Sequence, residues 1–246
     1  VLIGNLESDE VGMSLGINNE REYHSIEFMH YAYLNMGRQS TARQVLENLR
    51  EVMSDDIYLR MRYGIMSDRY IIETQDYNFI FENPFDLIVC SSCRQVGDIH
   101  WMDQINAGLL LVKGFSTIKN DKEYSSIIVE DYIQQLANMS MRLNKTEPTF
   151  VVSIQAMILQ LQAFQTFYRL SKTDSKKSIA LNYARMASKL ELSVNPPCYG
   201  PPMDPVKPSQ ELYGEMFEPL KDRNVFKGFR VHPEFHTLCW PNGADI

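Results

Sequence analysis

The stretch from Tyr23 to Met53 most constrains the fold, because it reads as two amphipathic helices joined by a tight turn. Gly37 stands between them and can end the first helix in a left-handed conformation without a Cβ clash. Ala42, early in the second helix, is small enough to let two helices pack closely. The large apolar residues at helical spacing are Ile26, Met29, Tyr33, Leu46 and Leu49. One such pair cannot bury its own apolar face, so further pairs are expected.

The next part of the chain supplies more helices of this kind. Ser54-Asp55-Asp56 offers N-cap residues and predicts a helix from Ile57 to Thr74. That helix ends at Gln75-Asp76-Tyr77, which corresponds to the turn at Gly37 after the first helix of the first pair. The acidic pair Asp55-Asp56 is better interpreted as a helix cap than as a catalytic pair. Further helices are predicted at Trp101 to Ile118, Tyr124 to Leu143, Phe150 to Leu170 and Lys176 to Leu192.

Two segments depart from the helical pattern. Asn83-Pro84 ends the preceding structure, and Phe85 to Val89 reads as either a short strand or a buried loop. Near the end of the chain, Phe226 to Val231 and Thr237 to Trp240 have the composition of two short strands. The predicted domains are an N-terminal loop or truncated element at 1–22, a helical array at 23–193, a Pro-rich linker at 194–208, and a short helix plus β-hairpin at 209–246.

Residues about 22–217 resemble a bacterial family of tetratricopeptide-repeat (TPR) proteins of undefined activity. Gly37 and Ala42 fall where the 34-residue TPR unit places its turn and its small residue. The other carrying features are HYAYLNMGRQSTARQVL (His30 to Leu46), Asp68-Arg69-Tyr70, Lys189-Leu190-Glu191, Gly200-Pro201-Pro202, Pro208, Glu211-Leu212 and Gly214-Glu215. The resemblance implies an all-α, TPR-like α-solenoid of stacked antiparallel helical hairpins. It also implies that the chain corresponds to the C-terminal part of such a protein.

Residues about 215–246 resemble the end of a second bacterial family, a small domain of unknown function of the DUF2442 type. Phe226, His236-Thr237 and the run from Trp240 to Ile246 carry this resemblance. The N-terminal strands of that domain have no counterpart in the chain, so a fusion and a sequence join are both compatible with the match.

In TPR proteins, the first helix of each hairpin lines a concave groove that binds an extended peptide or a partner helix. The groove positions carried over by the resemblance are His24, Glu27, Tyr31, Leu34 and Asn35 in the first unit, and Arg62, Ile65, Arg69, Ile72 and Glu73 in the second. Arg69 would bind a partner carboxylate through two hydrogen bonds, and Tyr31 and Asn35 would bond a peptide backbone. The alternative is that these residues are solvated or packed under a neighbouring helix. The implied function is a non-enzymatic protein-interaction scaffold without a cofactor.

Cys90-Ser91-Ser92-Cys93 supports an alternative function, a redox or metal-linked accessory protein. A redox-active CxxC needs a strand before it and a helix after it. A zinc site needs four ligands, of which Cys90 and Cys93 supply two, with Asp98 and His100 nearby. Incidental loop cysteines are the simpler interpretation. His232, His236 and Cys239 have ligand-like spacing but also suit the polar positions of a hairpin.

Composition narrows the class of partner. The net charge of −7, with no cluster of Lys or Arg, disfavours nucleic acid, so a protein or peptide partner is expected. The absence of an uninterrupted apolar run of about 18 residues predicts no membrane span. Four cysteines indicate a reducing compartment, and the predicted location is cytoplasmic. The chain begins at Val1 rather than at Met, which leaves open a targeting segment upstream.

Overall fold

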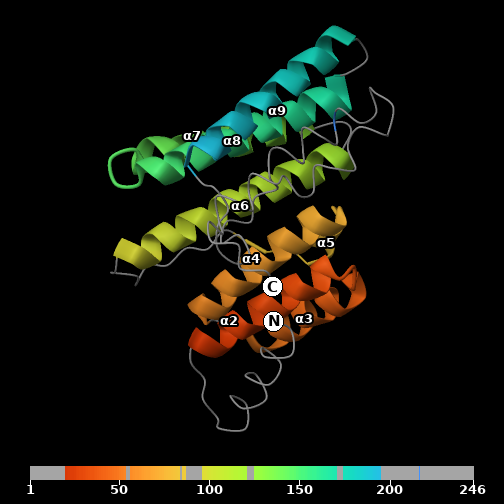
Figure 1. The fold of residues 1–246 in the computed structure, drawn as a ribbon, viewed down its shortest axis with the longest axis vertical. Coiled ribbons are helices and arrows are strands. Elements are labelled where there is room, and N and C mark those ends of the chain that lie inside the picture. Colours follow the sequence, from red (N-terminus) through yellow and green to blue (C-terminus); the bar gives the residue numbers. More distant parts are fainter. Residues whose placement is uncertain are drawn as a thin grey trace, which may run out of the picture. The chain divides into compact units, whose positions relative to one another are not determined.

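The computed structural model describes residues 20–53, 56–83, 85–86, 96–120, 125–170, 174–194 and Met216. Within these residues all regular structure is helical and no strand occurs (Figure 1). The elements are α2 (Glu20–Asn35), α3 (Gln39–Met53), α4 (Ile57–Thr74), α5 (Phe79–Glu82), α6 (Val96–Asn120), α7 (Ser125–Leu143), α8 (Pro148–Gln165), η1 (Thr166–Leu170) and α9 (Asp174–Val194). The prediction of a helical body is therefore confirmed for this part of the chain. The predicted C-terminal hairpin lies outside it.

The chain divides into two compact units, and the boundary falls inside α6 between Val112 and Lys113. The first unit contains α2, α3, α4, α5 and the first part of α6. The second unit contains the last part of α6, then α7, α8, η1, α9 and the described residue Met216.

The turn between α2 and α3 has the predicted chemistry. Gly37 is left-handed, with φ +70°, and the Arg38 N–H donates to the Tyr33 carbonyl at 2.9 Å. This bond closes the end of α2 in the manner of a Schellman cap. The buried residues of α3 are Ala42, Leu46 and Leu49, the positions expected from the sequence. The turn residue and the buried positions of the helix pair α2 and α3 are therefore those that the sequence predicts.

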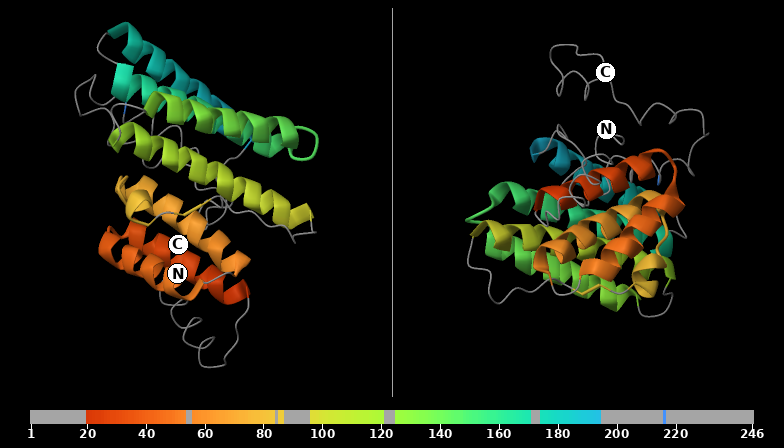
Figure 2. Two further views of the ribbon diagram at one scale, coloured as in Figure 1. Left: turned by 180° about the vertical axis from the view of Figure 1, so that it is seen from behind. Right: turned by 90° about the horizontal axis from the view of Figure 1, so that it is seen from below.

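Helix α4 begins and ends at the predicted residues. The Asp56 carboxylate accepts a hydrogen bond from the Leu59 N–H at 3.1 Å, which caps the start of the helix. Just beyond its end, Gln75 is left-handed with φ +57°, as Gly37 is after α2. Helix α4 packs against both α2 and α3, and the three helices run alongside one another in each view (Figures 1 and 2).

The break in the pattern after α4 contains the short helix α5 and a buried aromatic residue. The Phe79 ring lies 4.9 Å from that of Tyr70, and the Phe85 ring lies 5.3 Å from that of Tyr63. Phe85 is buried and Asp86 is exposed, and neither belongs to a strand; the rest of the predicted strand or loop, 87–89, lies outside the described residues. Gly64 lets α6 approach α4, because a Cβ there would lie 2.8 Å from Cγ2 of Ile105.

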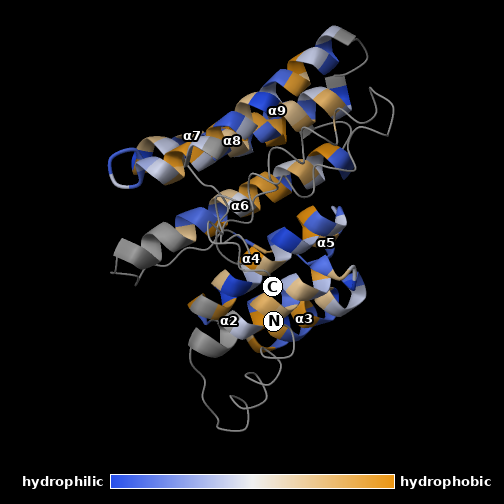
Figure 3. Ribbon diagram, viewed as in Figure 1, coloured by the Kyte–Doolittle hydropathy of each residue, from blue (hydrophilic) through white to orange (hydrophobic). Residues whose placement is uncertain are grey.

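In the second unit, α8 packs against both α7 and α9. The alanine stripe of α9 is fully buried: Ala180, Ala184 and Ala187. These small side chains let α9 approach its neighbour closely, as their spacing predicted. Gly114 of α6 plays the same part, since a Cβ there would collide with the side chain of Leu161 on α8. Figure 3 shows both apolar and polar residues along α9, as expected for a partly buried helix.

The end of α8 differs from the single helix predicted between Phe150 and Leu170. Pro148 occupies the first turn, as expected. The α-helix ends at Gln165, and the chain continues as the π-helical segment η1. The Arg169 guanidinium on η1 donates to the Thr117 and Ile118 carbonyls at 3.4 and 3.3 Å. These carbonyls belong to the last turns of α6, where a cation is favourable. The change in winding thus coincides with a tertiary contact that periodicity does not reveal.

Candidate functional site

A buried cluster of charged groups lies where α2 meets α4. Glu27 comes from the middle of α2, while Arg62 and Arg69 stand seven residues apart on α4 and so share one face of that helix. Arg62 Nη1 donates to Glu27 Oε2 at 2.6 Å, and Arg69 Nη1 lies 3.8 Å from Glu27 Oε1. The side chain of Glu27 is 0% exposed, and those of Arg62 and Arg69 are 11% and 4% exposed. One carboxylate therefore sits between two guanidinium groups away from water.

Tyr31 extends this cluster by one helical turn. The Arg69 guanidinium carbon lies 5.2 Å from the centre of the Tyr31 ring, within the range of a cation–π contact. Glu27 thus contacts both arginines, and Tyr31, further along α2, contacts the later one. This order indicates that α2 and α4 run in the same direction.

His30 is a residue of this region that the sequence analysis did not single out as a site residue. It is fully buried, and neither ring nitrogen has a hydrogen-bond partner among the described residues. Burial, with a smaller contribution from the charge of Arg69, lowers the pKa of His30 to about 3. The imidazole is therefore neutral near pH 7. The sequence signal for its place in this region is its position three residues after Glu27, which puts both residues on the same face of α2.

Asp68 is a second buried group that the sequence analysis did not assign to a site. Its side chain is 0% exposed and it directly precedes Arg69 on α4. In the sequence, the tripeptide Asp68-Arg69-Tyr70 stands out only as a feature of the family resemblance. The carboxyl group of Asp68, like that of Glu27, lies inside the protein, where Coulomb interactions are stronger than in water.

The cluster is suited to holding two helices in one relative register. A carboxylate placed between two arginines makes charge-assisted hydrogen bonds of defined geometry. Buried ion pairs add little net stability, but removing one partner is costly because the other charge is left uncompensated. A ligand carboxylate that approached Arg62 or Arg69 would have to compete with Glu27 for them.

The remaining predicted groove residues belong to the same two helices, α2 and α4. Leu34 is half-buried, Asn35 and Glu73 are exposed, and Asn35 Nδ2 donates to the Tyr31 carbonyl at 3.0 Å. His24 belongs to α2, but its side chain lies outside the described part. Ile65 and Ile72 are buried in α4. The structure therefore brings together Glu27, Tyr31, Arg62 and Arg69, and leaves Asn35 and Glu73 accessible near the helix ends.

A second charged cluster joins α3 to the segment that follows α4. The Arg43 guanidinium lies 3.1 Å from Glu47, 3.5 Å from Asp76 and 2.9 Å from Glu82. The hydrogen bond to Glu82 is the largest cause that raises the pKa of Arg43 above its ordinary value. The same guanidinium lies 5.3 Å from the centre of the Phe79 ring. Because these side chains are partly exposed, their ion pairs contribute little to the stability of the unit.

The candidate cysteine chemistry is not described by the structure. Cys90, Cys93, Cys198 and Cys239 lie outside the described residues, as do the side chain of His100 and the histidines near the C-terminus. In the part of the chain that the structure covers, no group of three His, Cys, Asp or Glu side chains could hold a metal ion.

One helix passes a test of length and composition for crossing a membrane, among the residues searched. It spans Pro148–Arg169 and thus includes α8, and 56% of its apolar window is buried inside the structure. Burial of this degree is typical of a core helix, and α8 is the helix between α7 and α9 in the second unit.

Comparisons of the chain with protein-family models, with curated proteins and with solved structures found no match.

Proposed function

We propose that the protein is a non-enzymatic interaction scaffold that binds a peptide or a partner domain along the face formed by α2 and α4. The observation that supports this proposal most directly is the pairing of Glu27 with Arg62 and Arg69. This pairing would hold α2 and α4, as the first helices of two successive helical hairpins, side by side and in the same direction. A TPR-type groove requires that arrangement.

The buried and exposed residues of this face have different parts in the proposal. Glu27, Arg62 and Arg69 hold the platform together, since they are enclosed and bonded to one another. Asn35 and Glu73 would contact the partner, because both are exposed near the ends of the two helices. Tyr31 and Leu34 would add half-buried apolar surface next to them. A partner with hydrogen-bonding backbone groups and a basic side chain for Glu73 would suit this surface.

The proposal is tested by quantitative affinity purification of the full chain with a double variant, Asn35→Ala with Glu73→Arg. Glu51→Arg is the matched control, because Glu51 is exposed on α3, which does not line the proposed groove. We expect the double variant to bind its partner protein at least about tenfold more weakly than the wild type, a loss of about 1.4 kcal/mol in binding free energy. The control should bind it as the wild type does.

Two outcomes would contradict the groove: no protein enriched by the wild type, or the same loss in both variants. Equal thermal unfolding of the three chains is required for the comparison. Arg69→Glu is unsuited to this test, because it would place a second carboxylate beside the enclosed Glu27 and act through folding.

A further inference from the structure

The segment η1, in the second unit, replaces α-helical winding by π-helical winding at the end of α8. A π turn joins a carbonyl to the amide five residues later, whereas an α turn joins it to the amide four residues later. The π winding is rare in proteins and is frequently found at functional sites. The contacts that η1 makes therefore indicate what this winding does.

Lys119, in the last turn of α6, lies on aromatic rings from α8 and η1. Its Nζ atom is 3.4 Å from the centre of the Tyr168 ring and 5.5 Å from the centre of the Phe164 ring. The centres of these two rings are 4.4 Å apart. The ammonium group is therefore attracted to the faces of both rings through cation–π interactions.

Arg169 makes the reverse contact, from η1 to α6. Its Nη2 atom donates to the Thr117 and Ile118 carbonyls at 3.4 and 3.3 Å. Because α6 ends at Asn120, these two belong to the last four carbonyls of the helix, which have no partner within it. A cation of α6 thus lies on an aromatic ring of η1, and a cation of η1 lies on carbonyls of α6.

Both contacts depend on the winding of η1. Rewinding this segment as an α-helix would close its turn with one residue fewer and rotate the side chains near its end by up to about 100°, the step of one residue. Tyr168 would then leave Lys119, and Arg169 would leave the carbonyls of α6. Tyr168 is 43% exposed and Lys119 is half-buried, so solvent surrounds part of this contact and leaves room for the change.

We propose that Thr166–Leu170 is a conformational switch controlled by Lys119. The segment is π-helical while the ammonium group lies on the rings of Phe164 and Tyr168, and it rewinds as an α-helix when that charge is removed from the rings. Because η1 contacts both α8 and α9, the change in winding alters the packing between these two helices. The switch lies in the second unit and does not depend on the groove proposed on α2 and α4.

Scalar couplings across hydrogen bonds, measured by NMR on the isotope-labelled full chain, identify the acceptor of each amide and hence the winding. In the wild type, the Leu170 amide should couple to the Gln165 carbonyl, five residues earlier. In Lys119→Met it should couple to the Thr166 carbonyl, four residues earlier. Lys119→Arg keeps a cation for the rings and should retain the wild-type acceptor. Lys113→Met, a half-buried lysine on the same helix, is the matched control and should retain it too. An unchanged acceptor in Lys119→Met, or a changed one in Lys113→Met, would overturn the proposal.

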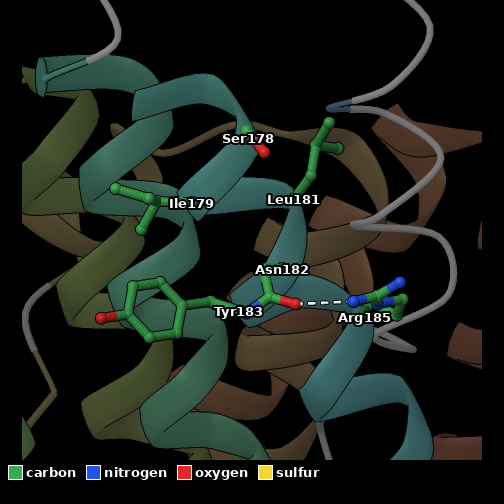
Figure 4. Close-up of a pocket in the computed structure, with 6 residues that line it drawn as sticks. All are labelled: Ser178, Ile179, Leu181, Asn182, Tyr183 and Arg185. Carbon is green, nitrogen blue, oxygen red and sulfur yellow. Dashed lines mark hydrogen bonds between the residues drawn. The ribbon is translucent and has the colours of Figure 1, made fainter. Parts of the chain in front are cut away.

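Substitutions of the ring test the other side of the contact with the same measurement. Tyr168→Phe keeps an aromatic face and should retain the π-helical acceptor, whereas Tyr168→Leu should change it as Lys119→Met does. Tyr183→Leu is the matched control, because Tyr183 stands on α9, where it lines a surface hollow (Figure 4). Loss of the π winding in Tyr168→Phe or Tyr183→Leu, or its retention in Tyr168→Leu, would refute the assignment of Lys119 and Tyr168 as the control of the switch.

Discussion

The helices inside the first unit and the helices inside the second unit are held together by different kinds of interaction. In the first unit, charged groups lie inside the interface between α2 and α4, where Glu27 meets Arg62 and Arg69. In the second unit, the close contacts are apolar and depend on small residues, as at Gly114 against Leu161 and along the alanine stripe of α9. A polar contact there, from Gln160 to Glu191 at 2.9 Å, joins α8 to α9.

This difference implies different responses to substitution. Ion pairs and hydrogen bonds have directional geometry, so the helices of the first unit are held in one register and tolerate little change in charge. Apolar packing is less directional, and its energy depends on how well volumes match. The first unit should therefore be sensitive to charge and pH, and the second to side-chain volume.

The largest effect is expected from Glu27→Gln. This change keeps the shape of the side chain but removes the negative charge between Arg62 and Arg69, so the free energy of unfolding of the first unit should fall by about 3–5 kcal/mol. Hydrogen exchange of the α2 and α4 amides measures this loss. Glu73→Gln is the control, since Glu73 is exposed and its change should stay within about 0.5 kcal/mol. Equal effects of the two substitutions would refute the structural part assigned to the cluster.

The next effect concerns volume in the second unit. Leu161→Ala should cost about 3 kcal/mol of unfolding free energy, because it leaves a cavity in a fully buried site. Gly114→Ala places a methyl group where Leu161 now lies, and in the Leu161→Ala background that methyl group enters the vacated space. The double variant should thus be more stable than the sum of the single effects by about 1 kcal/mol. Urea unfolding of the four chains gives these values, and simple additivity would disprove the contact.

His30 should make the first unit sensitive to acid. Between its ordinary pKa of 6.5 and the lowered pKa of about 3, the unfolded chain binds a proton at His30 and the folded chain does not. Stability therefore falls as the pH falls through this range, by about 2 kcal/mol from pH 7 to pH 5. His30→Phe should remove this part of the slope in hydrogen exchange of α2. The same slope in both chains would show that His30 is not buried as a neutral group.

The smallest effect is expected at the two turns of the first unit. Gln75 is left-handed, so Gln75→Gly should raise the unfolding free energy by about 1 kcal/mol, and Gly37→Gln should lower it by a similar amount. Thermal unfolding of the two variants and the wild type measures both changes in unfolding free energy. Changes of the same sign would contradict the equivalence of the two turns.

Much of the helical architecture could be predicted from the sequence because its signals are local. Helix α4 has the predicted ends, since Asp56 caps its start and Gln75 follows its end. The buried positions of α3 and the alanine stripe of α9 follow from periodicity alone. The change to π-helical winding at Thr166 was not predictable in this way, because it accompanies contacts of η1 with α6.

The candidate site was less predictable than the helices. Glu27, Arg62 and Arg69 were named as groove residues through a family resemblance, and the structure encloses them together. Their side chains could equally have faced solvent, since a charged residue on a helix carries no local signal for burial. His30 and Asp68 were not assigned to a site for the same reason. Their contribution to partner binding stays a prediction.

By itself, the sequence determined both ends of α4 and the turn between α2 and α3, because caps, left-handed turn residues and apolar spacing act within a few residues of one another. Only the tertiary structure decided which charges are withdrawn from water and which partners they meet. Glu27 and Arg62 are 35 residues apart in the chain, and their pairing depends on two helices that pack side by side. Burial is a property of that packing rather than of either residue.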